Sequence, residues 1–178
     1  MRYTFVKQHD ATDCAAACLA MICLHYKKET TITKLRDMMG TDLKGTNLIG
    51  LSKSADELGF ASQAVRVDKE GFISKYTLPC IANIITKEGL SHFVVIFKIT
   101  EKDVIVGDPA KDLIKITIDE LYKDFTGVIL VQPTLINYMF RLSKFPPAAL
   151  SEVVVATATT HSSALQAENL SCAKHIVN

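Results

Sequence analysis

The sequence predicts an α+β fold in which helices near the N-terminus pack on an antiparallel β-sheet formed by the residues that follow. Up to about residue 60, apolar residues recur at helical spacing, and beyond it short apolar runs alternate with turn residues. After Pro133 the chain is rich in Ala, Thr, Ser and Val without a sustained period. We therefore expect one domain over residues 1–134. Residues 135–178 are expected to form a linker or tail, helical at first, then irregular and in part vector-encoded.

The first two helices are predicted from their ends. Asp13 could cap a helix that starts near Cys14 and carries apolar residues at helical spacing. The segment TITKLRDMMG predicts a second helix that starts near Thr31 or Thr33 and stops at Gly40.

The third helix is predicted over GTNLIGLSKSADELGF. Its apolar residues fall on one face, and Gly59 ends it. The residues on that face are Leu48, Leu51, Ala55 and Leu58.

Beyond Gly59 the sequence predicts strands. FASQAVRVD alternates in the manner of a half-buried strand, and the step TEKD at residues 100–103 indicates a tight hairpin. Short helices are expected at GFISKY and DELYKDF. The other strand-like runs are LPCIANII, LSHFVVIFKI, DVIVGDPA, LIKITI and GVILVQP.

Composition and charge argue against two classes of partner. Lys and Arg number 20 against 19 Asp and Glu, which lacks the basic excess that nucleic-acid binding requires. No apolar stretch approaches the roughly 20 residues of a membrane-spanning helix. Five cysteines cannot all pair with one another, so a reducing, cytosolic setting is the simpler interpretation.

The segment QHDATDCAAACLAMI holds two cysteines four residues apart and poses the chemical question. Cys18 and Cys23 lie inside the predicted first helix, and core packing is the favoured interpretation for both. A redox pair needs two residues between its cysteines, and Cys14 and Cys18 have three. His9 and His25 lack the spacing of zinc ligands. We expect no metal and no cofactor.

Cys14 differs from the other cysteines because it is predicted in the first turn of a helix. The backbone N–H groups and the helix dipole stabilise a thiolate there, which makes the sulfur nucleophilic. Asp13 opposes this effect, so a cationic partner would help. A nucleophilic cysteine also needs a histidine that is near in space.

His92 opens the strongest predicted strand, and Asp108 ends the next one. A hairpin at residues 100–103 would bring them together, so that the carboxylate could fix the imidazole tautomer. Gln8 precedes Cys14 by six residues and could donate to an oxyanion together with the Cys14 backbone N–H. Taken singly, each has an ordinary alternative: a half-exposed strand histidine, a turn aspartate and a surface glutamine.

The arrangement resembles the double-glycine leader peptidase domain of peptidase-containing ABC transporters for bacteriocins and lanthipeptides, which are papain-like cysteine proteases. The resemblance covers residues 1–133 and is carried by QHDATDCAAACLAMI, GTNLIGLSKSADELGFASQAVRV, LPCIANII, SHFVVIFKI and VGDPA. It implies a papain-like fold with Cys14 as nucleophile and His92 as general base and acid. It further implies that Asp108 orients His92 and that Gln8 supplies an oxyanion donor.

The chain departs from the family pattern in two places. Ala15 stands where the family usually has glycine, and we expect activity to survive because alanine is small and favours helices. The transmembrane helices and nucleotide-binding domain that follow the peptidase in the family are not recognisable here, so we expect an excised domain. The parent transporter would hold it at the cytoplasmic side of the bacterial cell membrane.

The resemblance also implies the substrate. It would be a precursor peptide whose leader forms an amphipathic helix and ends in Gly-Gly or Gly-Ala, with cleavage after that pair. Met38, Met39 and Leu51 are candidates for the leader-binding groove, although core packing is the commoner role for each. Two alternatives stay open: a peptidase-like domain that only binds cargo, and a papain-like amidase acting on another amide.

Overall fold

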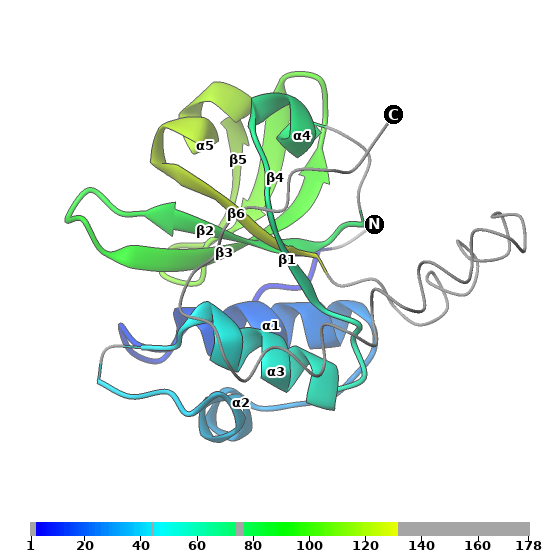
Figure 1. The fold of residues 1–178 in the computed structure, drawn as a ribbon, viewed down its shortest axis with the longest axis vertical. Coiled ribbons are helices and arrows are strands. Elements are labelled where there is room, and N and C mark those ends of the chain that lie inside the picture. Colours follow the sequence, from blue (N-terminus) through cyan, green and yellow to red (C-terminus); the bar gives the residue numbers. More distant parts are fainter. Residues whose placement is uncertain (1–2, 44, 74–76, 132–178) are drawn as a thin grey trace, which may run out of the picture. The chain divides into compact units, whose positions relative to one another are not determined.

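The computed structural model describes residues 3–43, 45–73 and 77–131, and the predicted tail over 135–178 lies outside the described residues. The described part contains helices on both faces of one sheet (Figure 1). Its elements are α1 (Cys14–His25), α2 (Ile32–Met39), α3 (Leu48–Glu57), β1 (Gln63–Arg66), α4 (Lys69–Ile73), β2 (Cys80–Ile85), β3 (Ser91–Ile99), β4 (Asp103–Gly107), β5 (Leu113–Thr117), α5 (Ile118–Asp124) and β6 (Phe125–Val131).

The sheet has the strand order β1-β6-β2-β3-β4-β5, and every neighbouring pair is antiparallel. The predicted α+β class is therefore confirmed. Strands β2 to β5 are joined in chain order, and β6 returns to lie between β1 and β2. The hairpin between β3 and β4 closes at Thr100, whose backbone N–H donates to the carbonyl of Asp103 at 2.8 Å.

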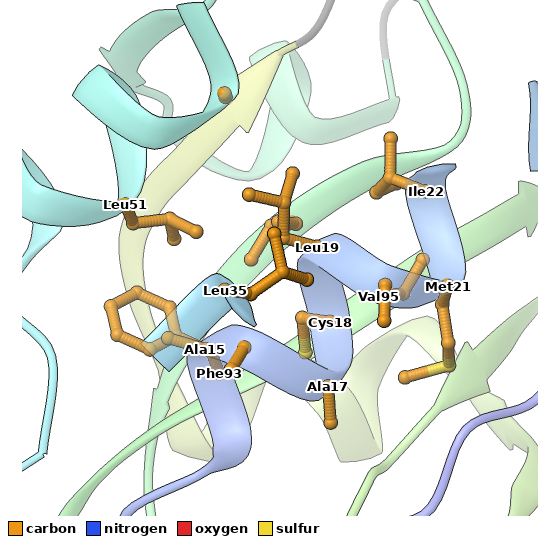
Figure 2. Close-up of a cluster of buried hydrophobic side chains, with 14 of the residues drawn as sticks. Ala15, Ala17, Cys18, Leu19, Met21, Ile22, Leu35, Leu51, Phe93 and Val95 are labelled. Atoms are coloured by element: carbon orange, nitrogen blue, oxygen red, sulfur yellow. The ribbon is translucent and has the colours of Figure 1, made fainter. Parts of the chain in front are cut away.

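Helix α1 is buried on all sides. Every residue from Cys14 to Cys23 is buried, which explains why this segment is almost entirely apolar. Figure 2 shows α1 side chains in one cluster with Leu35 of α2, Leu51 of α3 and residues of β3. The helix that begins with Cys14 is thus fixed between two helices and the sheet.

Strand β3 is buried on both faces. Phe93, Val95 and Phe97 pack with α1, while Val94 and Ile96 pack in a second cluster on the opposite face, with residues of α4 and α5. Because side chains alternate along a strand, burial on both faces requires a continuous apolar run. This accounts for the sequence HFVVIF.

The helix ends agree with the sequence predictions except at Asp13. Thr31 caps α2 by accepting from the Lys34 N–H at 3.3 Å, and Gly40 ends it with a φ of 62°. Asp13 does occupy the N-cap position of α1, but its side chain makes no capping hydrogen bond. The prediction that Asp13 caps α1 is wrong because its carboxylate is bound to Arg36 instead.

Strand β1 lies at the edge of the sheet. The half-buried alternation predicted at FASQAVRVD is confirmed: Val65 and Val67 pack partly buried against the second cluster, while Ala64 and Arg66 are exposed. Helix α3 packs directly on α2: a Cβ on Gly50 would come within 2.6 Å of the Met39 carbonyl oxygen. No helix in the described part of the chain has the length and apolarity needed to cross a bilayer.

Candidate active site

Cys14 is the first residue of α1 and has only 6% of its surface exposed. Burial of the rest of α1 fixes the helix axis and therefore the direction of its first turn. The unpaired N–H groups of this turn and the helix dipole favour a negative charge on the Cys14 sulfur.

His92 and Asp108 form a buried pair at the ends of β3 and β4. The His92 Nε2 lies 2.8 Å from Asp108 Oδ1, and the residues are 8% and 2% exposed. Asp108 Oδ1 also accepts from the backbone N–H of Ala110 at 3.0 Å, and its Oδ2 pairs with Lys111 Nζ at 2.9 Å. These contacts fix the carboxylate, which in turn orients the imidazole.

The side chain of His92 also interacts with that of Cys14, and this interaction contributes to the raised pKa of His92. Because Nε2 is committed to Asp108, the Nδ1 atom is left for the cysteine. Cys14, His92 and Asp108 are thus brought together in the order that the sequence predicted, from the start of α1 and from two adjacent strand ends.

Hydrogen bonding decides the protonation of this pair. Burial alone would lower the pKa of His92, but the hydrogen bond to Asp108 and the interaction with Cys14 raise it to about 9. Burial alone would raise the pKa of Asp108, but bonds from His92 and Lys111 lower it to about 2. At neutral pH the site therefore favours an imidazolium between two groups that can carry negative charge.

Gln8 lies on the loop that leads into α1 and is tied to the other side of the site. Its backbone N–H donates to the carbonyl oxygen of Pro109 at 3.0 Å, directly beside Asp108. Its side-chain Oε1 is buried and accepts no hydrogen bond within the described residues. The amide is thus held near the site by its backbone, while its oxygen has no protein partner there.

Sequence reasoning missed a network of ion pairs behind the nucleophile. The Asp13 carboxylate is fully buried and is bound by Arg36 of α2, which also binds Asp10 at 2.8 Å. The sequence indicated that a cation should offset Asp13, but nothing in it indicated which one. Arg36 is remote in sequence and stands in an ordinary amphipathic helix.

The other cysteines in the described residues are poorer nucleophiles. Burial, followed by the charges of Cys14 and Asp108, raises the pKa of Cys18 well above its usual value. Burial raises the pKa of Cys23 to about 11. Cys18, Cys23 and Cys80 are each 0% exposed. Their place is the core, as predicted for Cys18 and Cys23.

Comparison with known proteins gives the class. The chain matches the Peptidase C39 family over residues 2–134 and belongs to that family of cysteine peptidases. It is 42% identical over 126 residues to the lactococcin-G-processing and transport ATP-binding protein LagD of Lactococcus lactis subsp. lactis, covering 70% of this chain. The pediocin PA-1 transport/processing ATP-binding protein PedD of Pediococcus acidilactici is 33% identical over 135 residues.

Two solved structures share the fold. One is a double glycine motif protease from an AMS/PCAT transporter in complex with the leader peptide, with a TM-score of 0.67 and 32% identity over 75% of this chain and 93% of that one. The other is the peptidase domain of Streptococcus ComA, with a TM-score of 0.69 and 27% identity over 74% of this chain and 98% of that one. The chain spans only 18% of LagD and 19% of PedD, so it corresponds to a small part of those relatives.

Proposed function

We propose that this chain is a papain-like endopeptidase that removes the leader from bacteriocin or lanthipeptide precursors by cutting after Gly-Gly or Gly-Ala. One observation carries the proposal: His92 is hydrogen-bonded to Asp108 and interacts with Cys14, which is the first residue of a buried helix. A nucleophile, a base and an orienting carboxylate in this order form a cysteine-protease triad.

In the proposed reaction, the Cys14 thiolate attacks the carbonyl carbon of the residue before the cut. The Cys14 backbone N–H and the Gln8 side-chain amide donate to the resulting oxyanion. His92, already protonated, gives its proton to the leaving amine as the C–N bond breaks and a thioester forms. His92 then takes a proton from a water molecule as the water oxygen attacks the thioester carbon. The C–S bond breaks, the leader leaves with a free carboxyl group, and the Cys14 thiolate and the protonated His92 are restored.

We propose that the preference for small residues before the cut comes from a narrow cleft at the site. A narrow cleft admits glycine, which lacks a side chain, or the single methyl group of alanine, whereas the branched side chain of valine at the second position would meet the cleft walls. Gly-Gly pairs are common in proteins, so a second contact has to supply the remaining specificity. In the relative solved as a complex, the partner is the leader peptide, which supports assigning this second contact to the leader.

The leader helix is proposed to dock by its apolar face against α2, α3 and the loop between them. Leu43 and Ile49 are large apolar residues of this region that are 97% and 68% exposed, and Met38 is half-buried. The sequence had also suggested Met39 and Leu51 for this groove, but they are 7% and 0% exposed and belong to the core. Apolar side chains exposed in this way favour an amphipathic helix as the ligand.

The relatives are named as transport and processing ATP-binding proteins, and this supports a role in peptide export. We propose that the domain acts at the cytoplasmic side of the bacterial cell membrane. Its partners there are the transmembrane and nucleotide-binding domains of a parent ABC transporter. The cargo-binding alternative is disfavoured by the intact Cys14–His92–Asp108 arrangement, and a different papain-like amidase is tested by substrate choice.

The test is steady-state cleavage of a synthetic precursor with a Gly-Gly leader, with mass spectrometry of the products. Valine in place of the second glycine should lower kcat/KM by roughly tenfold to a hundredfold or more, since overpacking a rigid site costs about 1–3 kcal/mol. Aspartate in place of an apolar leader residue should mainly raise KM, because that contact is made equally in the ground and transition states.

Cys14→Ala is the matched control, and it should abolish cleavage while leaving leader binding intact. Cleavage by Cys14→Ala would reject the nucleophile. Unselective digestion of casein, or indifference to both substrate changes, would replace the leader-peptidase proposal with a general protease.

A further inference from the structure

The buried carboxylate directly before the nucleophile is the least expected feature of this site. Asp13 is 0% exposed and adjoins Cys14, yet it does not cap the helix on which Cys14 lies. An aspartate at an N-cap normally accepts from the first backbone N–H groups. Here the carboxylate is directed toward Arg36, and its negative charge belongs to the residue adjoining the cysteine that has to become a thiolate.

The carboxylate is held from two directions. Arg36 of α2 donates to Asp13 Oδ1 through Nη1, and the backbone N–H of Asp10 donates to Asp13 Oδ2 at 3.2 Å. The same Nη1 donates to Asp10 Oδ2 at 2.8 Å. One guanidinium group therefore fastens both ends of the turn formed by residues 10–13.

The turn is closed by further bonds within itself. The Asp13 N–H donates to the Asp10 carbonyl at 3.3 Å, and the Thr12 hydroxyl donates to Asp10 Oδ1 at 2.6 Å. The Thr12 hydroxyl, followed by Arg36, lowers the pKa of Asp10. Two carboxylates and one guanidinium thus form a single network, and the residue that follows it in the chain is Cys14.

The charges around Cys14 come from several elements. From β3 and β4 it faces His92 with Asp108 behind it, and from its own helix it faces Cys18. From the preceding turn and α2 come Asp13 and the Arg36 that neutralises it. A carboxylate within a few ångströms disfavours a thiolate, and a cation paired with that carboxylate removes most of the effect.

We propose that Arg36 is a positioning residue of this site: by pairing with Asp13 it holds the turn that leads into Cys14 and cancels the negative charge of the residue adjoining the cysteine. The inference rests on the proposed role of Cys14 as nucleophile. It deepens that role by assigning a regulating charge to α2, a helix that contributes none of the proposed triad. Arg36 itself acts through Asp13 and Asp10 and requires no contact with the peptide.

We expect substitutions of Arg36 and of Asp13 to change the stability of the Cys14 thiolate in opposite directions. Arg36→Gln leaves Asp13 without its cation and disfavours the thiolate, whereas Asp13→Asn removes the opposing charge and favours it. A residue that only stabilises the fold would give both variants the same sign. The measurement is the rate of Cys14 alkylation by iodoacetamide between pH 4 and 10, with peptide mapping to identify the modified cysteine.

We expect the midpoint of this rate profile to rise by about 0.5 to 1 pH unit in Arg36→Gln and to fall by a similar amount in Asp13→Asn. Below the midpoint, Arg36→Gln would then react about three- to tenfold more slowly. Arg36→Lys keeps the charge but loses the planar fork, so its midpoint should stay close to that of the unsubstituted protein while its melting temperature falls. Lys34→Gln, an exposed charge on the same helix, is the matched control and should leave the midpoint unchanged.

Shifts of the same sign in Arg36→Gln and Asp13→Asn, or a midpoint that moves in neither, would overturn the inference. If Arg36→Gln does not fold, Asp13→Asn still decides, because an unmoved midpoint there contradicts the charge argument. Alkylation of the unsubstituted protein distinguishes a failure of this inference from a failure of the proposed function. Slow alkylation of Cys14 there rejects the nucleophile, whereas fast alkylation with unmoved midpoints rejects only the role of Arg36.

Discussion

The two sides of the candidate site are held in place by different interactions. On the base side, His92 and Asp108 stand at the ends of paired strands, and the β3–β4 ladder fixes their spacing. On the nucleophile side, Cys14 follows a turn that is fastened by the guanidinium of Arg36, whose side chain is 31% exposed. The base side therefore depends on backbone pairing in the core, and the nucleophile side on a charge network that solvent partly reaches.

This difference bears on where substitutions act. The β3–β4 ladder is packed in the core, so a substitution there that displaces the backbone costs stability and moves the residues at the strand ends. The Arg36 guanidinium is part-exposed, but the Asp13 carboxylate that it neutralises is fully buried, so removing the cation leaves a buried charge unpaired and also changes the potential at a reacting atom. We expect the thiolate to be more sensitive to substitutions on the nucleophile side than to substitutions on the base side.

The largest expected effect is that of Asp108→Asn on the base side. Without the carboxylate, His92 loses its tautomer and orientation, and kcat should fall by about 10²- to 10⁴-fold. Asp108 also helps to raise the pKa of His92 to about 9. The proton that His92 gives to the leaving amine is lost as pH rises through that value. The alkaline limb of kcat/KM should therefore lie near pH 9 and move to lower pH in Asp108→Asn.

The measurement is kcat/KM between pH 6 and 11 for both proteins. Asp103→Asn makes the same substitution in β4, at a residue that pairs with the exposed Lys115, and serves as control. An alkaline limb that stays in place in Asp108→Asn would show that this carboxylate does not set the protonation of His92.

The next prediction compares Gly107 and Gly50, two glycines at which an added Cβ would make a close contact, one on each side of the site. A Cβ on Gly107, directly before Asp108, would lie 2.8 Å from the Phe97 ring and 3.1 Å from the Met21 sulfur. Gly107→Ala should therefore destabilise the fold by about 1–3 kcal/mol and, by displacing Asp108, lower kcat about tenfold. The measurements are urea denaturation and steady-state cleavage.

Gly50→Ala is the counterpart on the helical side, because its Cβ would clash with a backbone oxygen of α2. Its net destabilisation should be comparable, because the clash is shorter and with backbone that cannot move aside, while alanine regains up to about 1 kcal/mol of helix propensity. It should leave kcat unchanged at temperatures where the protein is folded. If Gly50→Ala lowers kcat as much as Gly107→Ala does, the two sides are not mechanically distinct.

A smaller effect is expected in the pH dependence of stability. The pKa of Asp108 is about 2 in the folded protein against a usual value of 3.8. The stabilisation that it supplies is therefore fully present above about pH 4 and is lost as pH falls through 2. The difference in unfolding free energy between the protein and Asp108→Asn should shrink by about 2 kcal/mol between pH 5 and pH 2.

Denaturant unfolding at a series of pH values gives this difference directly, because carboxylates common to both proteins cancel. Asp119→Asn, which breaks the exposed pair with Lys69, should show no comparable change. If this difference in unfolding free energy stays constant down to pH 2, folding does not lower the pKa of Asp108.

Local sequence patterns predicted most of the fold, whereas strand pairings between residues far apart in the sequence could not be predicted. The helices, the β3–β4 hairpin and the burial of Cys18 and Cys23 follow from spacing, turn residues and apolar runs, and the structure confirms them. The return of β6 between β1 and β2 joins residues about 65 apart in β1 and β6 and about 45 apart in β2 and β6, and no local signal specifies that pairing. The boundary at residue 134 and the tail stay predictions.

The residues of the candidate site also divide into those that local sequence patterns predicted and those that only the tertiary structure shows. Cys14, His92 and Asp108 were recognised because each stands at the start or end of a predicted element, and Gln8 because it precedes Cys14 by six residues; their catalytic roles stay predictions. Arg36 was missed because its partner Asp13 matches an N-cap by sequence, and only the tertiary structure shows which cation reaches it. Lys111 was missed because it lies in an ordinary polar turn after Asp108.

The smallest expected effect is that of Lys111→Gln, and it tests most directly whether the two sides of the site are held by different interactions. Lys111 and Arg36 both pair with a buried carboxylate next to a proposed catalytic residue, but the Lys111 side chain is 69% exposed. Asp108 keeps His92 and the Ala110 N–H when Lys111 is removed. We therefore expect a stability change of less than about 1 kcal/mol and less than about a threefold change in kcat. If Lys111→Gln instead lowers kcat as much as Arg36→Gln slows alkylation, both sides of the site depend on surface cations and the ladder of β3 and β4 is not sufficient to hold the base.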